Sequence, residues 1–171
     1  YDDFLKVLGD IAAAGKNALV WPPEAAPMPF ALYSYFNAQY GGQGPVTCDN
    51  SAVTINDEAS VNAVQLIKNI YDTGAMLEVD WLTPEYWDAI NKNQLVMTIA
   101  PAWERGFWES NIDEGQFGNW KTMPLPLAVE GGPNTGIWGG ATLIAKADTA
   151  EPELAKRFMS FAFGSMEGAQ A

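Results

Sequence analysis

Residues 91–103, which read NKNQLVMTIAPAW, contain the segment that decides the fold. Leu95–Ala100 is a nearly continuous apolar run, and a short run of this kind predicts a strand that is buried on both faces. Pro101 ends the predicted strand because proline lacks the backbone N–H that a sheet needs. We expect a helical turn to follow and to run through Trp108.

The segments before this strand have helical patterns. Thr83 is the expected N-cap of a short helix that has Pro84 at its first position. Further upstream, Asn56 or Asp57 is expected to cap a helix that runs to about Thr73. Its predicted buried face carries Val61, Val64, Ile67 and Tyr71.

Other helices and strands alternate along the chain. Helices are expected over 2–14, 30–40 and 151–163, and Ser165 is expected to cap a final short helix. Short strands or extended segments are expected over 18–21, 119–125 and 141–145. This alternation predicts an α/β fold with a short mixed sheet flanked by helices.

The composition favours a binding protein over an enzyme. The chain of 171 residues has seven tryptophans, one cysteine and no histidine. Tryptophan offers a flat apolar surface and one N–H donor, which suits a ligand with an apolar face and a polar rim, such as a sugar ring. The missing histidines remove the commonest general base and the commonest metal ligand. We expect no metal and no cofactor.

The charge narrows the range of partners. Nine Lys and Arg residues against 21 Asp and Glu residues give a net charge of −12. No basic patch is present to neutralise phosphates, so the composition argues against nucleic acid and against an anionic membrane surface. The sequence begins at Tyr1 on a helical pattern, without a signal peptide or lipobox. We therefore expect it to be a piece of a longer protein.

Several segments, taken in order, resemble a known family. They are GKNALVW (15–21), YSYFNAQYGG (33–42), VTINDEASVNAVQLIKNIYDTG (53–74), NKNQLVMTIAPAW (91–103), NWKTMPLPL (119–127), GGPNTGIWGGATLIAKA (131–147) and EPELAKRFMSFAFGSMEG (151–168). Together they resemble the extracellular solute-binding proteins of sugar ABC importers, in the group that includes the maltodextrin-binding protein. The fold implied is a type II periplasmic-binding-protein lobe.

The resemblance implies a two-lobed protein that closes around its ligand. Residues 1–135 correspond to the second lobe, and residues 136–171 to the hinge and the returning segment of the first lobe. Glycines Gly136, Gly139 and Gly140 are the expected hinge. The implied partners are a sugar ligand and the membrane permease, and the implied location is extracytoplasmic, in the periplasm or as a lipoprotein at the cell surface. A monomer is expected.

The resemblance also points to ligand-binding residues. Pro101-Ala102-Trp103 is similar to the family's Gly-Pro-Trp turn, whose tryptophan commonly stacks on the ligand. Trp21 and Trp138 fall at family positions beside the cleft, and Trp81 precedes a helix N-terminus from which it is expected to reach the site. Glu104 and Arg105 offer hydrogen bonds to hydroxyls, although either also fits a solvated or salt-bridged surface group. Trp87, Trp108 and Trp120 are expected to pack structurally.

Two other functions stay open at this point. A carbohydrate-active hydrolase would use a pair of carboxylates, with Asp80, Glu85, Glu104 and Glu109 as candidates. A binding module for a cationic solute such as a polyamine would enclose the cation between acidic residues and tryptophans. Release of reducing sugar would indicate the hydrolase, and binding that weakens sharply with added salt would indicate the cation-binding module.

Overall fold

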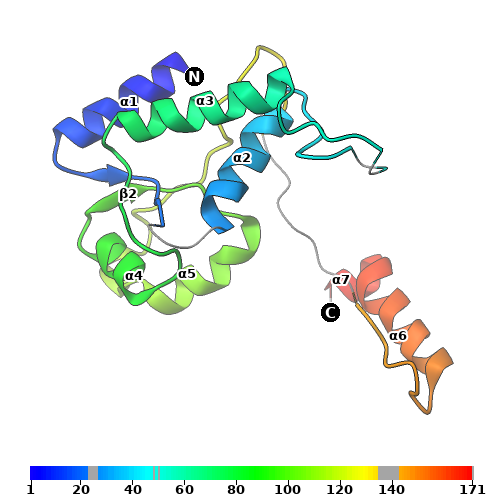
Figure 1. Cartoon of the computed structure of the whole chain (residues 1–171). Coiled ribbons are helices and arrows are strands. Elements are labelled where there is room, and N and C mark those ends of the chain that lie inside the picture. Colours follow the sequence, from blue (N-terminus) through cyan, green and yellow to red (C-terminus); the bar gives the residue numbers. More distant parts are fainter. Residues whose placement is uncertain (23–26, 48, 50, 135–142, 171) are drawn as a thin grey trace. The chain divides into compact units, whose positions relative to one another are not determined.

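The computed structural model describes residues 1–22, 27–47, 49, 51–134 and 143–170 (Figure 1). The chain divides into two compact units, Tyr1–Trp138 and Gly139–Ala171, and each is described by itself. Across the described ranges, no helix combines the length and the apolar character needed to cross a membrane. The predicted boundary between residues 135 and 136 lies outside the described residues.

The first unit is built on a small parallel sheet. Strand β1 (Asn17–Ala18) pairs with β2 (Leu95–Met97), with Asn17 opposite Leu95 and Ala18 opposite Met97. Because a parallel pair needs a long crossover connection, helices lie between the two strands in sequence. The structure therefore belongs to the α/β class, as predicted.

A third extended segment lies on the other side of β1. The Ala18 amide donates to the Ala75 carbonyl at 2.7 Å, and the Leu77 amide donates to the Leu19 carbonyl at 3.0 Å. Val20 and Leu77 also form a parallel bridge. The segment after β1 is thus hydrogen-bonded to 75–77 on one side, while β2 bonds β1 on the other.

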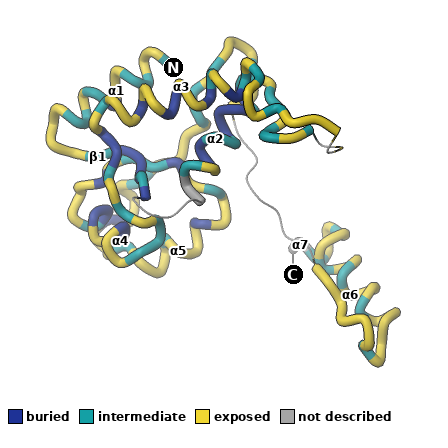
Figure 2. Tube along the Cα trace, viewed as in Figure 1, coloured by how far each residue is buried: buried dark blue, intermediate teal, exposed yellow. Residues whose placement is uncertain are grey.

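Helices and 3₁₀ turns flank this sheet (Figure 1). In chain order they are α1 (Asp2–Ala13), α2 (Pro27–Gln39), α3 (Glu58–Asp72), α4 (Pro84–Asn91), η1 (Ala102–Glu104), α5 (Arg105–Asn111) and η2 (Glu114–Gln116). Helix α2 packs against α3, and α1 packs against β1. The core between them is apolar and nearly free of solvent exposure, as Figure 2 shows in dark blue.

Capping residues set the helix starts where the sequence predicted them. The Asp57 carboxylate accepts a hydrogen bond from the Ser60 amide at 2.7 Å and so caps α3. The Thr83 hydroxyl accepts from the Tyr86 amide at 3.4 Å, with Pro84 in the first turn of α4. Each cap satisfies an amide that the helix itself leaves without a partner. Gly74, with φ of +73°, ends α3 in the left-handed conformation.

The predicted buried face of α3 is largely wrong. Val61 and Val64 are 57% and 56% exposed, and Tyr71 is also exposed. Of the predicted face, Ile67 is buried, and the helix adds Ala63, Leu66, Ile70 and Ser60 to it. The sequence offers two apolar stripes at helical spacing, and the choice between them depends on packing that periodicity alone does not contain.

Two predicted strands also differ from the structure. The apolar run at 95–100 forms a strand only at Leu95–Met97, and its middle residue Val96 is 39% exposed, so it is not buried on both faces. Residues 119–125 form no strand. Pro124 and Pro126 lack amide hydrogens. The Leu125 amide donates to the Asn134 carbonyl at 3.0 Å, and the Asn119 amide closes a turn onto the Gln116 carbonyl at 3.1 Å, so neither bond belongs to a strand ladder.

The second unit contains α6 (Pro152–Gly164) and α7 (Met166–Gln170). The Ser165 hydroxyl accepts from the Gly168 amide at 3.0 Å, which confirms the predicted cap of the last helix. The apolar side chains of α6, including Leu154, Phe158 and Phe161, are exposed within this unit. Of the predicted extended segment 141–145, residues 141 and 142 lie outside the described residues, and 143–145 have no strand pairing.

Candidate functional site

Three aromatic side chains form a partly exposed surface in the first unit, here called the aromatic surface: Trp81, Trp103 and Phe107. The Trp81 and Trp103 rings lie 5.3 Å apart between centroids, with 58° between their planes. Phe107 meets Trp103 edge-on at 6.0 Å. Trp103 is 51% exposed and Phe107 is 48% exposed, so both rings offer apolar area to solution. These separations are typical of favourable aromatic pairs.

Both tryptophans follow extended segments of the sheet. Trp103 lies in η1, shortly after β2 ends, and Trp81 follows the segment 75–77. In α/β proteins, ligands bind outside the carboxyl ends of parallel strands, because the loops that leave those ends converge there. The predicted residues Trp81 and Trp103 are therefore brought together at a place where such folds bind ligands.

The turn that carries Trp81 is tightly held. The Thr83 hydroxyl donates to the Asp80 carbonyl at 2.7 Å, and Leu82 adopts a left-handed φ of +62°. A non-glycine residue in this conformation costs free energy and persists only where its surroundings hold it. The Trp81 ring is consequently presented by a short constrained turn directly before α4.

Glu104 lies beneath this surface and is fully buried. Its Oε1 atom accepts a hydrogen bond from the Tyr86 hydroxyl at 2.8 Å and another from the Trp108 indole N–H at 3.0 Å. The expectation of a solvated or salt-bridged Glu104 is wrong, because burial removes it from water and its partners are neutral. In this conformation the side chain does not reach a ligand on the surface.

Burial raises the pKa of the Glu104 carboxyl, because a charged carboxylate is poorly solvated in the protein interior. Hydrogen bonding from Tyr86 and Trp108, together with the Trp81 side chain, acts in the opposite direction and lowers this pKa in part. Burial, reinforced by the same carboxylate, raises the pKa of Tyr86, which stays a protonated donor at physiological pH.

Arg105 is a salt-bridged surface residue, which was one of the two predictions for it. Its Nε atom pairs with Glu109 at 2.9 Å, and its side chain is 86% exposed. The pair spans one helical turn, an arrangement that contributes little to stability in water. A role for Arg105 in ligand binding stays a prediction.

The remaining predicted site residues are not joined to the aromatic surface by a described contact. Trp21 is half-buried and meets the Tyr71 ring edge-on, with centroids 5.6 Å apart. Trp138, Gly136, Gly139 and Gly140 lie outside the described residues. Their roles in binding and in the hinge stay predictions.

Three other tryptophans form a packed aromatic row: Trp87, Trp108 and Trp120. Trp87 and Trp108 meet edge-on at 5.8 Å, and Trp108 and Trp120 meet at 4.6 Å. Trp87 is buried, and the other two are partly buried against the core. The structural roles predicted for these three residues are confirmed.

Sequence reasoning missed Phe107 and Tyr86 as parts of this region. Phe107 lies four residues after Trp103, a helical spacing that would have indicated a shared face once the turn after Pro101 was taken as helical. Tyr86 gave no comparable signal, because its contact with Glu104 joins residues 18 positions apart.

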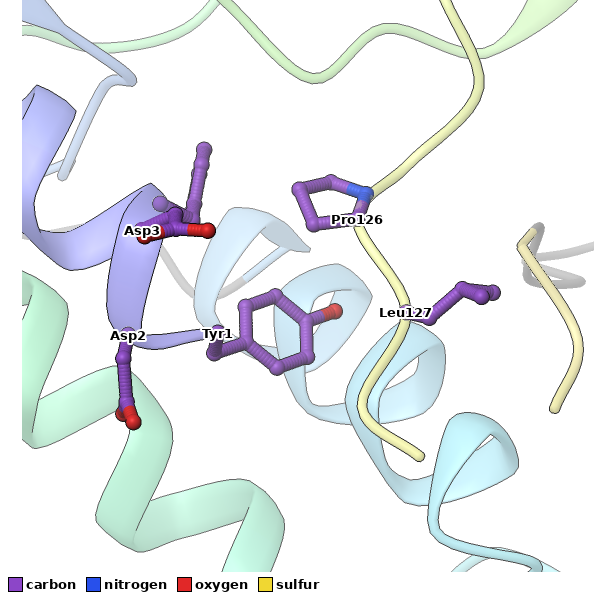
Figure 3. A pocket seen from close by; sticks show the side chains of 6 residues that line it. Tyr1, Asp2, Asp3, Pro126 and Leu127 are labelled. Atoms are coloured by element: carbon purple, nitrogen blue, oxygen red, sulfur yellow. The ribbon is translucent and has the colours of Figure 1, made fainter. Parts of the chain in front are cut away.

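Two open hollows among the described residues of the first unit lie apart from the aromatic surface. The one in Figure 3 has a volume of about 480 Å³ and is lined by Tyr1, Asp2, Asp3, Phe4, Pro126 and Leu127. A second hollow runs along α3 beside the exposed Val61 and Val64. Neither contains a residue predicted to bind ligand. No cluster of three or more potential metal ligands occurs among the described residues.

Comparisons with known proteins give one informative relative. The chain is 26% identical over 122 residues to the arabinooligosaccharide-binding protein of Bacillus subtilis (strain 168). The match covers 70% of this chain but only 28% of that protein, so the chain spans well under half of its relative. No family model matches the chain. No solved structure matches it either.

Proposed function

We propose that this chain binds an oligosaccharide on the aromatic surface of Trp81, Trp103 and Phe107. The observation that carries the proposal is the pairing of the half-exposed Trp103 ring with the partly buried Trp81 ring, with centroids 5.3 Å apart and planes 58° apart. The two inclined rings offer apolar faces to successive sugar units, while hydroxyl groups stay at the polar rim. The distant relative, named for binding arabinooligosaccharides, supports this class of ligand.

The wider role follows from the sequence resemblance. We infer a solute-binding component of an ABC importer, located outside the cytoplasm and monomeric. Residues 1–135 belong to one lobe and 136–171 return toward the other, with closure about Gly136, Gly139 and Gly140. Closure brings Trp21 and Trp138 to the ligand, and the membrane permease reads the closed form. No catalysis and no cofactor enter this mechanism.

Binding is favoured over hydrolysis by the position of Glu104. It is the carboxyl whose pKa burial raises, as a general acid requires, yet none of its surface is exposed to a substrate. Another predicted candidate, Glu109, is an exposed group paired with Arg105. Among the described carboxylates, therefore, none combines a raised pKa with an accessible side chain.

Calorimetric titration of the protein with arabino-oligosaccharides, malto-oligosaccharides and spermidine tests the proposal. Removal of the Trp103 indole eliminates about 100 Å² of apolar contact, so Trp103→Ala should weaken oligosaccharide binding by roughly 30- to 100-fold. Phe117→Ala, which removes an aromatic ring that is 54% exposed elsewhere, is the matched control and should leave the affinity unchanged.

Three results would contradict the proposal. Binding of spermidine alone, weakened strongly by salt, would favour a cation-binding module. Release of reducing sugar from the oligosaccharide would indicate a hydrolase. Equal affinities of the native protein and Trp103→Ala for the oligosaccharide would remove the aromatic surface from the site.

A further inference from the structure

Glu104 is a fully buried carboxylate surrounded by neutral donors. Its described hydrogen bonds come from the Tyr86 hydroxyl and the Trp108 indole. The adjacent cation, Arg105, is paired with Glu109 on the surface instead. Burial of a carboxylate without a cation lowers stability unless hydrogen bonds compensate, so this carboxylate calls for a specific structural reason.

The carboxylate joins the elements that carry the aromatic surface. Tyr86 belongs to α4, which begins directly after the turn of Trp81, and Trp108 belongs to α5, which also carries Phe107. Glu104 itself follows Trp103 in η1. The Trp81 side chain lies close enough to Glu104 to act on its ionisation. One buried group therefore contacts or adjoins every element of this surface.

We propose that Glu104 is a positioning residue that fixes the Trp81 and Trp103 rings relative to each other. Its bonds to α4 and α5 hold η1 in one orientation, and η1 sets the direction of Trp103. A pair of rings held in advance loses less conformational freedom on binding than two independent rings. The consequence for oligosaccharide affinity rests on the function proposed above, whereas the positioning does not.

Circular dichroism of the ligand-free protein measures the positioning directly. Two indoles at this separation couple electronically, and the resulting exciton band depends on their distance and angle. The contribution of this pair is the part of the spectrum that Trp103→Phe removes, which separates it from the coupling within the packed aromatic row. In parallel, oligosaccharide affinity is measured by calorimetry.

Glu104→Leu removes both oxygen acceptors, so the pair's exciton contribution should disappear and the affinity should fall by about tenfold or more. Glu104→Gln keeps an oxygen acceptor for Tyr86 and Trp108. It should restore the exciton contribution and bring the affinity to within about threefold of the native value. The double variant Glu104→Leu/Trp103→Phe should lose no more of the pair's signal than Trp103→Phe alone.

Glu109→Gln is the matched control, because it neutralises a carboxylate on the next helical turn that is paired at the surface. Glu109→Gln should leave the exciton contribution of the pair and the oligosaccharide affinity at their native values. Should Glu104→Leu fail to fold, Tyr86→Phe removes one donor with almost no change in volume and should reduce the exciton contribution in part. This second variant keeps the proposal testable.

The proposal is overturned if folded Glu104→Leu, or in its place Tyr86→Phe, keeps the full exciton contribution of the pair. If the variant is less stable but keeps the full exciton contribution, Glu104 has a purely structural role and the proposal is likewise overturned. If the coupling is lost as expected but the native protein binds no oligosaccharide, the positioning stands and the proposed function fails.

Discussion

The aromatic surface and the packed aromatic row use the same residue type in opposite ways. Trp87 lies on the buried face of α4, next to Tyr86, and is 7% exposed. Trp103 lies in a 3₁₀ turn of three residues and is 51% exposed. Helix α4 turns Trp87 toward the core, whereas the turn η1 buries Glu104 and leaves Trp103 on its exposed side. The element that carries a tryptophan, more than the number of tryptophans, determines whether it is available to a ligand.

The two groups meet at one carboxylate. Glu104 accepts a hydrogen bond from Trp108 of the packed aromatic row and directly follows Trp103 of the aromatic surface. The rigid core is thereby connected to the exposed rings through hydrogen bonds instead of through apolar packing alone. Substitutions on either side of this carboxylate should separate stability from binding.

The largest expected effect is the loss of a buried indole. Trp87→Ala should lower the free energy of unfolding by about 3–5 kcal/mol, because a large buried side chain is replaced by a cavity. Trp103→Ala should change it by no more than about 1 kcal/mol, because half of that side chain is already in water. Urea denaturation followed by circular dichroism measures both values.

Equal losses of stability for the two variants would contradict this comparison. Phe36→Leu, which changes a fully buried side chain of α2 while keeping it apolar, serves as a reference for an ordinary core substitution. Its cost should fall between the two tryptophan variants.

A smaller effect should appear in the pH dependence of stability. Burial raises the pKa of Glu104 in the folded state, so the folded state favours the protonated carboxyl. The associated stability is present in acid and is lost as the pH rises through the folded-state pKa. Glu104→Gln should remove this pH-dependent part of the free energy of unfolding. The effect is smaller than the loss of an indole because it concerns one proton.

Other ionisable groups near Glu104 do not obscure this measurement. Tyr86 of α4 and Tyr35 of α2 interact with the carboxylate, and both stay neutral because their pKa values are raised. Arg105 is paired at the surface with Glu109. The other carboxylates are common to both proteins, so the difference between the two pH profiles isolates Glu104. Parallel profiles from mildly acidic to neutral pH would show that its ionisation does not differ between the folded and unfolded states.

Local chemistry allowed the sequence to predict most element boundaries. The caps at Asp57 and Thr83 depend on residues within three positions of one another, and such contacts are readable in a single sequence. The class of the fold followed from the alternation of these elements. The pairing of β1 with β2 depends instead on segments about 80 residues apart, and the sequence indicated only that strands exist there.

The site was harder to predict because burial is a tertiary property. Glutamate usually lies on the surface, and nothing nearby in the sequence shows that Tyr86 donates a hydrogen bond to Glu104 in the interior. The choice between the two apolar stripes of α3 failed for the same reason. Trp81 was predicted correctly to precede a helix and Trp103 to follow a strand, yet their contact across 22 positions required the fold.

Phe107 tests how far the aromatic surface extends. The ring is 48% exposed and meets Trp103 edge-on, so it should contribute less contact area to a ligand than an indole does. Phe107→Ala should lower oligosaccharide affinity by about three- to tenfold, equivalent to about 1 kcal/mol, measured by calorimetry. Phe30→Ala, at a ring of similar exposure on α2, is the control. A loss as large as that of Trp103→Ala would mean that the ligand is centred on α5.

The smallest effect is expected at Arg105. Its ion pair with Glu109 is exposed and spans one helical turn, so Arg105→Gln should lower stability by no more than about 0.5 kcal/mol, and added salt should reduce that difference further. Oligosaccharide affinity is the more informative measurement, because a ligand hydroxyl must compete with Glu109 and with water for the guanidinium. We expect a change below about threefold. A loss of tenfold or more, absent in Glu109→Gln, would instead place the guanidinium on the ligand and extend the binding surface from the aromatic rings to the exposed side of α5.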